Sequence, residues 1–207
     1  SKYQIPTISK RHITSATYFR FLLGDIIDDS IDKILFLDSD ILVYKQLDRI
    51  YDINLNKNTI AAVEEKIDIN DIRLKEICHS SPSYFNAGVM LINLKRWRDE
   101  KIKDKLFSSI SVYQKQIKWP SQDPLNIVFN GRWKIIDNTF NTMNDRIDSI
   151  NSSKITIFHY VGSIKPWSSF KKNYFHTTYR DYMMKFAPFR SMIFLLKNKL
   201  KWMINNE

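Results

Sequence analysis

The chain has 207 residues, of which 43% are hydrophobic and 14% aromatic; this is enough for the core of one domain and excludes a disordered chain. Its single cysteine, Cys78, excludes an intramolecular disulfide framework and a zinc cluster built from cysteines. The formal net charge of +10 indicates a polyanionic partner: nucleic acid, an anionic membrane surface or a phosphate-bearing substrate. The longest apolar runs fall well short of the roughly 20 residues that a membrane span needs.

In chain order, apolar residues at helical spacing first predict a helix over residues 14–27, which Thr14 or Ser15 would cap. Short apolar runs predict strands at 31–37, 41–43, 59–63, 87–92, 133–136 and 155–160. The polar stretch 67–83 is expected to be a loop with a helical turn. Further helices are predicted at 94–117, ended by Pro120, and at 122–130, stopped by Gly131. Strands that alternate with helices predict an α/β layered fold, and the strand 31–37, which is apolar throughout, predicts a sheet covered on both faces.

The tail after Pro188 changes character. Basic residues lie between apolar residues that recur at helical spacing. The apolar residues are Phe189, Met192, Ile193, Leu196, Leu200 and Met203. This pattern predicts a basic amphipathic helix, a common form at membrane surfaces. The alternative is a helix that packs on the domain and keeps its lysines in water.

Two aspartates, Asp38 and Asp40, stand where the strand 31–37 breaks into a loop. In an open α/β sheet, ligands bind beyond the carboxyl ends of the strands. Two carboxylates this close repel each other unless a cation lies between them, and Mg²⁺ and Mn²⁺ often bridge carboxylates to substrate phosphates. The pair therefore indicates a divalent metal site, with a solvated acidic turn as the alternative.

His159 lies at the end of another predicted strand, so it too is expected at a carboxyl edge, where an imidazole is a suitable third ligand for Mn²⁺. Gly162 lets the backbone approach a ligand closely, and Lys165 has the charge to neutralise a phosphate. A histidine satisfied within the core is the alternative. The neighbouring Lys165-Pro166-Trp167 favours the site.

Two weaker signals involve polar residues beside buried elements. Asn86 precedes the strand 87–92, where it either hydrogen-bonds a sugar hydroxyl or caps its own turn. Gln122 and Asp123 open the helix 122–130, where Asp123 either accepts hydrogen bonds from sugar hydroxyls or interacts with the helix dipole.

In this order, the four motifs resemble glycosyltransferase family 8, in particular its bacterial lipopolysaccharide glucosyl- and galactosyltransferases. The resemblance extends from about Arg11 to Trp167. Its motifs are Arg11-His12-Ile13-Thr14 with Thr17-Tyr18-Phe19-Arg20, Asp38-Ser39-Asp40, Phe85-Asn86-Ala87-Gly88-Val89 through Trp97, Gln122-Asp123, and His159 through Trp167.

The resemblance implies a GT-A fold, that is, a Rossmann-like α/β nucleotide-diphospho-sugar transferase fold with a mixed sheet flanked by helices. It implies UDP-galactose or UDP-glucose as donor, Mn²⁺ or Mg²⁺, and retention at the anomeric carbon. We expect a catalytic domain over residues 1–170 and a basic helical C-terminal region over 171–207. We also expect a lipopolysaccharide core acceptor and a cytoplasmic, peripheral location at the inner face of a bacterial inner membrane.

The resemblance further implies roles for single residues. Asp38, Asp40 and His159 would bind the metal, which would stabilise the UDP leaving group. Lys165 and Gly162 would contact the diphosphate.

Around the donor sugar, the resemblance places Gln122 and Asp123 as catalytic residues, with the Gln122 amide as an electrostatic stabiliser. The substrate-binding set would also include Arg20, Asn86 and His12.

The sequence departs from the family pattern at two places. Family members often carry an aspartate two positions before Asp123, where this chain has Ser121, so the choice between glucose and galactose stays open. Family members also usually have an N-terminal segment of strands and helices that cradles the uracil and ribose. We therefore expect this chain to be N-terminally truncated.

Other classes of function remain as alternatives. An inactive truncated remnant would bind at most metal or membrane, and a related enzyme would act on a protein or another glycan. A nucleic-acid binder is suggested only by the charge, because the four glycines form no phosphate-cradling loop.

Overall fold

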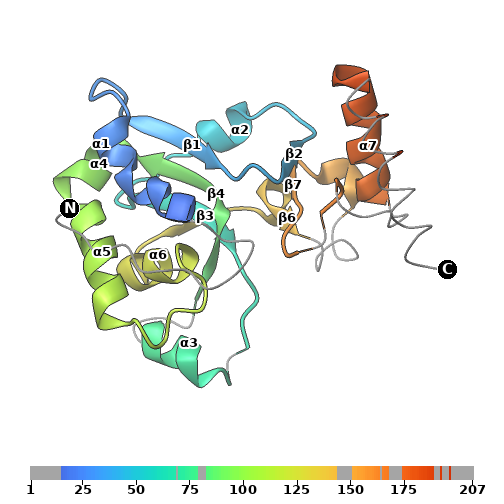
Figure 1. Cartoon of the computed structure of the whole chain (residues 1–207). Coiled ribbons are helices and arrows are strands. Elements are labelled where there is room, and N and C mark those ends of the chain that lie inside the picture. Colours follow the sequence, from blue (N-terminus) through green and yellow to red (C-terminus); the bar gives the residue numbers. More distant parts are fainter. Residues whose placement is uncertain are drawn as a thin grey trace.

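A computed structural model describes residues 15–68, 70–78, 83–143, 151–163, 165–167, 174–188, 192 and 196 (Figure 1). The predicted substrate-binding residue His12 lies outside the described residues. So does the predicted amphipathic helix after Pro188, apart from Met192 and Leu196, which are exposed.

The larger sheet has four strands in the order β1-β4-β3-β5, namely β1 (Lys33–Leu37), β4 (Phe85–Asn93), β3 (Ile60–Glu64) and β5 (Lys134–Ile135). Strand β4 is antiparallel to both of its neighbours, whereas β3 and β5 are parallel. The sheet is therefore mixed.

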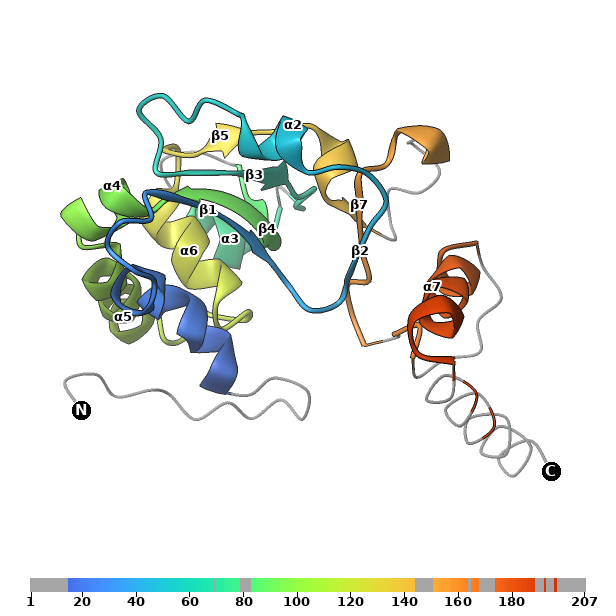
Figure 2. The same cartoon turned by 90° about the horizontal axis from the view of Figure 1, so that it is seen from above.

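Both faces of this sheet are covered, as Figure 2 shows. Ala62 and Met90 point to one face, where they pack with η1 (Ser15–Leu22), α4 (Leu94–Asp99), α5 (Ile102–Val112) and α6 (Gln122–Phe129). Ala61 and Leu91 point to the other face, toward α2 (Asp48–Tyr51) and η2 (Asn138–Phe140). Two buried faces explain why these strands are unbroken apolar runs.

Strand β1 lies at an edge of the described sheet. Ile34 and Phe36 pack on one face and Leu35 and Leu37 on the other, so the predicted coverage of both faces is confirmed. All five residues of β1 are nevertheless only half-buried. This partial burial follows from the position of β1 in the sheet, because among the described residues β1 pairs only with β4.

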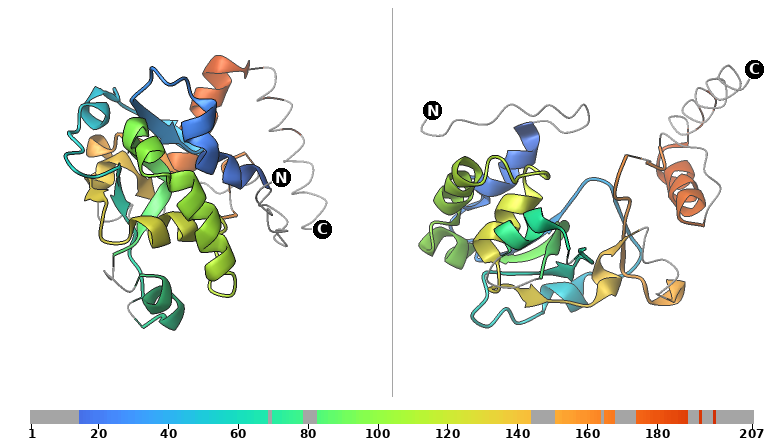
Figure 3. Two further views of the ribbon diagram at one scale, coloured as in Figure 1. Left: turned by 90° about the vertical axis from the view of Figure 1, so that its left-hand side faces the viewer. Right: turned by 90° about the horizontal axis from the view of Figure 1, so that it is seen from below.

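A second, smaller sheet has the order β2-β7-β6, namely β2 (Ile41–Val43), β7 (Ile157–His159) and β6 (Thr142–Met143). Helix α7 (Tyr174–Phe186) packs beside it, because the Phe175 ring stacks on Phe158 with 3.9 Å between centroids. Figure 3 shows α7 apart from the helices that cover the larger sheet. Within the described residues, we find no helix with the length and apolarity that a membrane crossing demands.

The connecting helices are short. Helix α1 (Leu23–Ile26) continues η1, so the helix predicted over 14–27 is mostly 3-10 in the structure. Helix α3 (Ile72–Ile77) is the helical turn expected in the stretch 67–83, and η4 (Ser152–Lys154) precedes β7. Helix α6 agrees with the prediction, and Gly131 after it has the positive φ of 69° of a helix stop.

The single helix predicted over residues 94–117 is wrong. It is divided into α4 and α5 at Lys101, whose backbone is left-handed with φ 52° and ψ 44°. Apolar periodicity continues through the break, because both helices bury residues on the same side of the sheet, so the pattern does not show it. Helix α5 also ends at Val112, well before Pro120.

The left-handed Lys101 predicts a stabilising substitution. Lys101→Gly is expected to raise the free energy of unfolding by about 0.5–1 kcal/mol, because glycine adopts this conformation without the Cβ clash. The measurement is urea unfolding. Lys105→Gly, at an exposed position within α5, is the matched control and should lower stability by about 1 kcal/mol. A Lys101→Gly chain that is less stable than the unaltered one would show that Lys101 is not strained.

Candidate functional site

Residues Asp38, Ser39 and Asp40 carry the chain from β1 in the larger sheet to β2 in the smaller one. The Asp38 N–H donates to the Gly88 carbonyl of β4 at 2.8 Å, and the Asp40 carbonyl accepts from the Tyr160 N–H at 2.9 Å. The segment is therefore anchored to β4 of the larger sheet and to the residue that follows β7 in the smaller one. Both carboxylates stand where the sheets meet.

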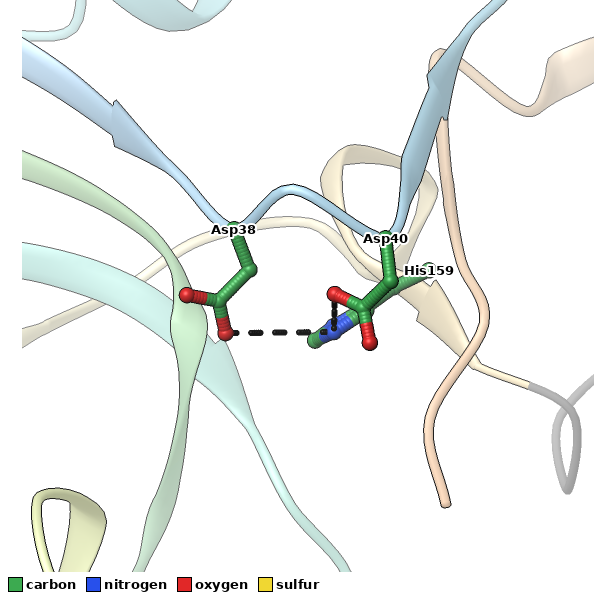
Figure 4. A group of neighbouring side chains, drawn as sticks. All are labelled: Asp38, Asp40 and His159. Carbon is green, nitrogen blue, oxygen red and sulfur yellow. Dashed lines mark ion pairs between the residues drawn. The ribbon is translucent and has the colours of Figure 1, made fainter. Parts of the chain in front are cut away.

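His159, the last residue of β7, reaches the same place from the other side. The β2–β7 register pairs it with Ile41, the residue after Asp40. Its Nε2 lies 3.2 Å from Asp40 Oδ1 and 4.0 Å from Asp38 Oδ2, and Figure 4 shows the ring edge between the two carboxylates. One ligand atom from each of the three residues lies within 4.8 Å of the others. The structure thus brings the three predicted metal-ligating residues together.

Gly88 determines how closely the imidazole packs. A Cβ added at Gly88 would lie 2.1 Å from Cε1 of His159 and 2.7 Å from its Nδ1. Any side chain at this position would displace the ring from the backbone of β4. The sequence pattern did not reveal this role, although Gly88 belongs to the motif that contains Asn86.

Two cations neutralise the carboxylates. Arg20 donates to Asp38 Oδ1 at 2.7 Å and to the Ala87 carbonyl at 3.0 Å, and its guanidinium lies 4.7 Å from the Phe36 ring centroid. The structure therefore places Arg20, expected beside the donor sugar, on the metal-ligand candidate Asp38.

Lys165 donates to the carboxylate of Asp40 and, at 2.5 Å, to the carbonyl of Tyr160. Burial raises the pKa of Asp40, but hydrogen bonds from His159 and Lys165 outweigh this effect and hold the pKa well below its usual range. Asp40 is therefore ionised at neutral pH.

This donor set fits a hard divalent cation. Two carboxylates and an imidazole are ligands that Mn²⁺ accepts, and carboxylates alone also serve Mg²⁺. The Lys165 ammonium contacts Asp40 Oδ2. It thereby supplies positive charge at a carboxylate oxygen that a metal ion would bind.

Glu65, the residue after β3, joins the two predicted amides. Its Oε2 accepts from Asn86 Nδ2 at 3.2 Å and from Gln122 Nε2 at 3.0 Å, while Gln122 Oε1 accepts from the Ala87 N–H at 3.0 Å. The sequence interpretation missed Glu65. The rule that found Asp38, a carboxylate directly after an apolar strand, would also have found it.

Asp123 is completely buried, and its carboxylate is saturated with hydrogen bonds. Oδ1 accepts from the Tyr84 hydroxyl at 2.5 Å, and Oδ2 accepts from Arg73 at 2.9 Å and from the N–H groups of Lys118 and Trp119 at 2.6 and 2.8 Å. Burial, followed by the nearby Asp123 charge, raises the pKa of Tyr84, which keeps this phenol a donor. The predicted contact of Asp123 with a sugar does not fit this geometry; the residue instead holds the start of α6.

Gly162 is exposed and has a φ of +86°. A Cβ added there would meet no atom within 4 Å, so the backbone conformation alone accounts for the glycine.

The saturated carboxylate of Asp123 predicts a structural role. Asp123→Asn is expected to lower the free energy of unfolding by about 3 kcal/mol, because the charge partner of Arg73 is lost and one buried donor is left unpaired. Urea unfolding measures this, with Asp52→Asn at an exposed site as the control. An Asp123→Asn chain of unchanged stability that no longer binds a donor sugar would restore the sugar contact.

Comparison with known proteins agrees with this fold. The family described as "Glycosyl transferase family 8" matches residues 4–171. The lipopolysaccharide 1,3-galactosyltransferase of Salmonella typhimurium is 31% identical over 174 residues, which are 78% of this chain and 52% of that protein. A lipopolysaccharide 1,2-glucosyltransferase of Escherichia coli is 30% identical over 191 residues, which are 84% of this chain and 56% of that protein. The chain thus spans about half the length of these relatives.

Among solved structures, the galactosyltransferase LgtC in complex with donor and acceptor sugar analogs superposes with a TM-score of 0.75 and 28% identity, over 84% of this chain and 68% of that one. The expected GT-A fold is thereby confirmed. Since the family match extends over most of the residues, the chain belongs to glycosyl transferase family 8.

Proposed function

We propose that this chain forms the metal- and diphosphate-binding part of a hexosyltransferase. It would move galactose or glucose from a UDP-sugar to a lipopolysaccharide core oligosaccharide, with retention at the anomeric carbon. The observation that carries the proposal is the convergence of Asp38, Asp40 and His159 from two sheets on one point. Family membership supplies the reaction class, and the names of the relatives support the donor and acceptor classes.

The three converging residues would hold Mn²⁺ or Mg²⁺, which when bound supplies Lewis-acid stabilisation of the UDP leaving group. Arg20 keeps the Asp38 carboxylate in place through its contacts with Asp38 and Ala87. Lys165, on a long and flexible side chain, would neutralise the diphosphate, and Gly162 would let the backbone approach it.

The side-chain amides of Gln122 and Asn86 would bind the donor sugar. Transfer forms a bond from the acceptor hydroxyl oxygen to the anomeric carbon and breaks the bond from that carbon to the diphosphate oxygen. UDP leaves with the electron pair, and the hydroxyl proton is released. Gln122 and Asn86 would orient the donor, because Glu65 and backbone N–H groups fix both side chains. Gln122 would stabilise charge that develops in the transition state. Asp123 would help to position Gln122 through the Tyr84 hydroxyl, which donates to Asp123 and accepts from Gln122 Nε2.

The names of the relatives and the net charge of the chain support lipopolysaccharide core as the acceptor. The relatives named above act, by their names, on lipopolysaccharide, and the net charge of +10 suits phosphorylated core sugars. A hollow lined by Glu65, Lys66, Asp137 and Asn138 at the ends of β3 and β5 offers polar groups to a hydroxyl-rich substrate. A protein acceptor is the alternative.

A peripheral position at the inner face of the inner membrane belongs to the same proposal. Met184 and Phe186 are exposed near the end of α7, and the sequence of residues 189–207 is rich in apolar and basic residues. Such a composition favours anionic lipid surfaces.

Calorimetric titration tests the proposed donor site. UDP-galactose and UDP-glucose are expected to bind the chain only when Mn²⁺ is present. Asp40→Asn and His159→Ala should each weaken this binding at least about 100-fold, because the first removes the negative charge of a ligand and the second removes a ligand altogether. The exposed variant Asp52→Asn is the matched control and should bind as the unaltered chain does.

Equal affinity without Mn²⁺, or in either ligand variant, would contradict the metal assignment. A folded chain that binds neither nucleotide sugar would favour the alternative of an inactive remnant.

Removal of residues 189–207 tests the membrane part. The shortened chain is expected to bind vesicles that contain anionic phospholipid at least about 10-fold more weakly, since apolar and basic residues are lost together. Co-sedimentation measures this, with neutral phosphatidylcholine vesicles as the control. Unchanged binding would contradict the role of the tail, and Mn²⁺-dependent donor binding should be the same in both chains.

A further inference from the structure

We propose that Arg73 is a positioning residue for Gln122, and that it acts from helix α3 through Asp123 and the Tyr84 hydroxyl. The inference rests on the proposed function for the use of Gln122 at the donor sugar. The connection between α3 and the Gln122 amide is argued from contacts within this chain and does not involve the candidate metal ligands.

The segment that carries α3 leaves the larger sheet after β3 and returns to it at β4, and its two ends meet. The Glu65 N–H donates to the Tyr84 carbonyl at 2.7 Å. The side chains of these two residues accept from the same nitrogen, Gln122 Nε2, at 3.0 Å for Glu65 Oε2 and at 3.2 Å for the Tyr84 hydroxyl. A displacement of this segment would therefore disturb the amide of Gln122.

Helix α3 lies below α6 in Figure 1 and belongs to a small apolar cluster of its own. The cluster is distinct from the two that cover the faces of the larger sheet. Because this cluster has fewer members than either of those, polar contacts contribute a larger share to the packing of α3. Its buried members are Leu74, Ile77, Cys78 and Tyr84, and the half-buried Ile67, Tyr113 and Ile127 pack around them.

Arg73 supplies a polar contact between α3 and α6. Its Nη1 donates to Asp123 Oδ2 at 2.9 Å and to the Gln116 carbonyl at 3.4 Å. The Asp123 side chain is fully buried, whereas that of Arg73 is 21% exposed. A buried carboxylate is strongly destabilised when its charge partner is removed. The packing of α3 against α6 therefore provides the positive charge that the buried Asp123 needs.

The Tyr84 hydroxyl connects Asp123 with Gln122. Asp123 Oδ1 accepts the one hydrogen of this hydroxyl at 2.5 Å, so the phenol oxygen can only accept from Gln122 Nε2. The other hydrogen of the amide goes to Glu65, and the amide oxygen accepts from the Ala87 N–H at 3.0 Å. Three contacts thus fix the amide, and an exchange of its oxygen and nitrogen would set like groups against Glu65 and Ala87.

The consequence concerns how firmly Gln122 is held beside the donor sugar. When α3 separates from α6, Asp123 loses its charge partner and the contact of Tyr84 with Gln122 weakens. The amide would act on charge that develops in the transition state, so a mobile amide lowers kcat and leaves KM for the donor little changed. If Arg73 were merely structural, its loss would lower stability and leave the amide of the folded chain as it is.

Two readouts follow this connection without metal or nucleotide. Cys78, the single cysteine, is buried at the end of α3, so its rate of reaction with an aromatic disulfide reagent measures how often α3 separates from α6. The side-chain NH₂ group of Gln122 is followed by NMR in a chain labelled with ¹⁵N-glutamine, and its signals are those absent from Gln122→Glu. We expect its hydrogens to exchange with solvent at least about 10-fold more slowly than those of a free glutamine side chain.

Variants on α3 separate positioning from packing. Arg73→Met, of similar length and without charge, should raise both the Cys78 reaction rate and the exchange rate of the Gln122 hydrogens at least about 10-fold. Arg73→Lys should return both rates to within about threefold of the unaltered chain, because one nitrogen of Arg73 contacts Asp123 and an ammonium can take its place. Lys75→Met, the matched control, removes an exposed cation from the same helix and should change neither rate.

Tyr84→Phe tests the route from Arg73 to Gln122. It removes the hydroxyl between Asp123 and Gln122 and keeps the ring, so the Gln122 hydrogens should exchange about 10-fold faster. Addition of Arg73→Met to Tyr84→Phe should then raise this rate by less than Arg73→Met does by itself, since both changes act on one connection. Equal increases with and without the hydroxyl would show that Arg73 does not act through Tyr84.

The inference is overturned if Arg73→Met makes Cys78 reactive and leaves the Gln122 exchange rate as it is in the unaltered chain. Should Arg73→Met fail to fold, Arg73→Gln, which can still donate to Asp123, takes its place with the same expected direction.

Donor turnover is the third readout. The kcat of Arg73→Met is expected to fall at least about 10-fold, with KM for UDP-galactose within about threefold of the unaltered chain. An unchanged kcat would contradict the role of Arg73. Absence of turnover by the unaltered chain would count against the proposed function instead, and the NMR measurement would still decide whether Arg73 positions Gln122.

Discussion

The pairing of Ile41 with His159 is the constraint on which the candidate site depends. Strands β2 and β7 are three residues long, and their register pairs Ile41 with His159. Because side chains alternate along a strand, a slip by one residue would turn the imidazole to the opposite face of the small sheet. The backbone bonds from the Tyr160 N–H to the Asp40 carbonyl and from the Tyr44 N–H to the Thr156 carbonyl flank the pairing and oppose this slip at both ends. The site thus exists only where two independent sheets meet correctly.

The balance of charge follows from that geometry. Two half-buried carboxylates are brought together, and each is matched by one cation from a distant part of the chain. The two cations are not equivalent. Arg20 also holds the Ala87 carbonyl and stacks on Phe36, whereas Lys165 reaches Asp40 on a flexible stem from beyond β7. Under the proposed function, an incoming metal would displace the lysine more readily than the arginine, and the released ammonium would stand beside the diphosphate.

Sequence patterns predicted what depends on neighbours along the chain and failed for what depends on contacts across it. Asp38, Asp40 and His159 could be predicted from the sequence because each follows or ends an apolar strand. The break at Lys101 was hidden, since a left-handed lysine leaves no mark on apolar periodicity. For Asp123, the sequence indicated a sugar contact or a helix start, whereas the donors that surround it come from α3, from Tyr84 and from the preceding turn. Asn141 also belongs to the contacts that the sequence did not reveal. It follows a 3-10 turn, and its hydrogen-bond partners His159 and Asn86 lie 18 and 55 residues away along the chain.

Buried and half-buried polar groups around the site form one connected series of hydrogen bonds, which includes groups that can only accept. Asp123 only accepts, so the Tyr84 hydroxyl donates to it and accepts in turn from Gln122 Nε2 at 3.2 Å. The same nitrogen reaches Glu65, a second group that only accepts. From Glu65 the hydrogen bonds continue through the side-chain amides of Asn86 and Asn141 to Nδ1 of His159. These hydrogen bonds therefore connect Asp123 at the start of α6 with the imidazole of His159 at the candidate site.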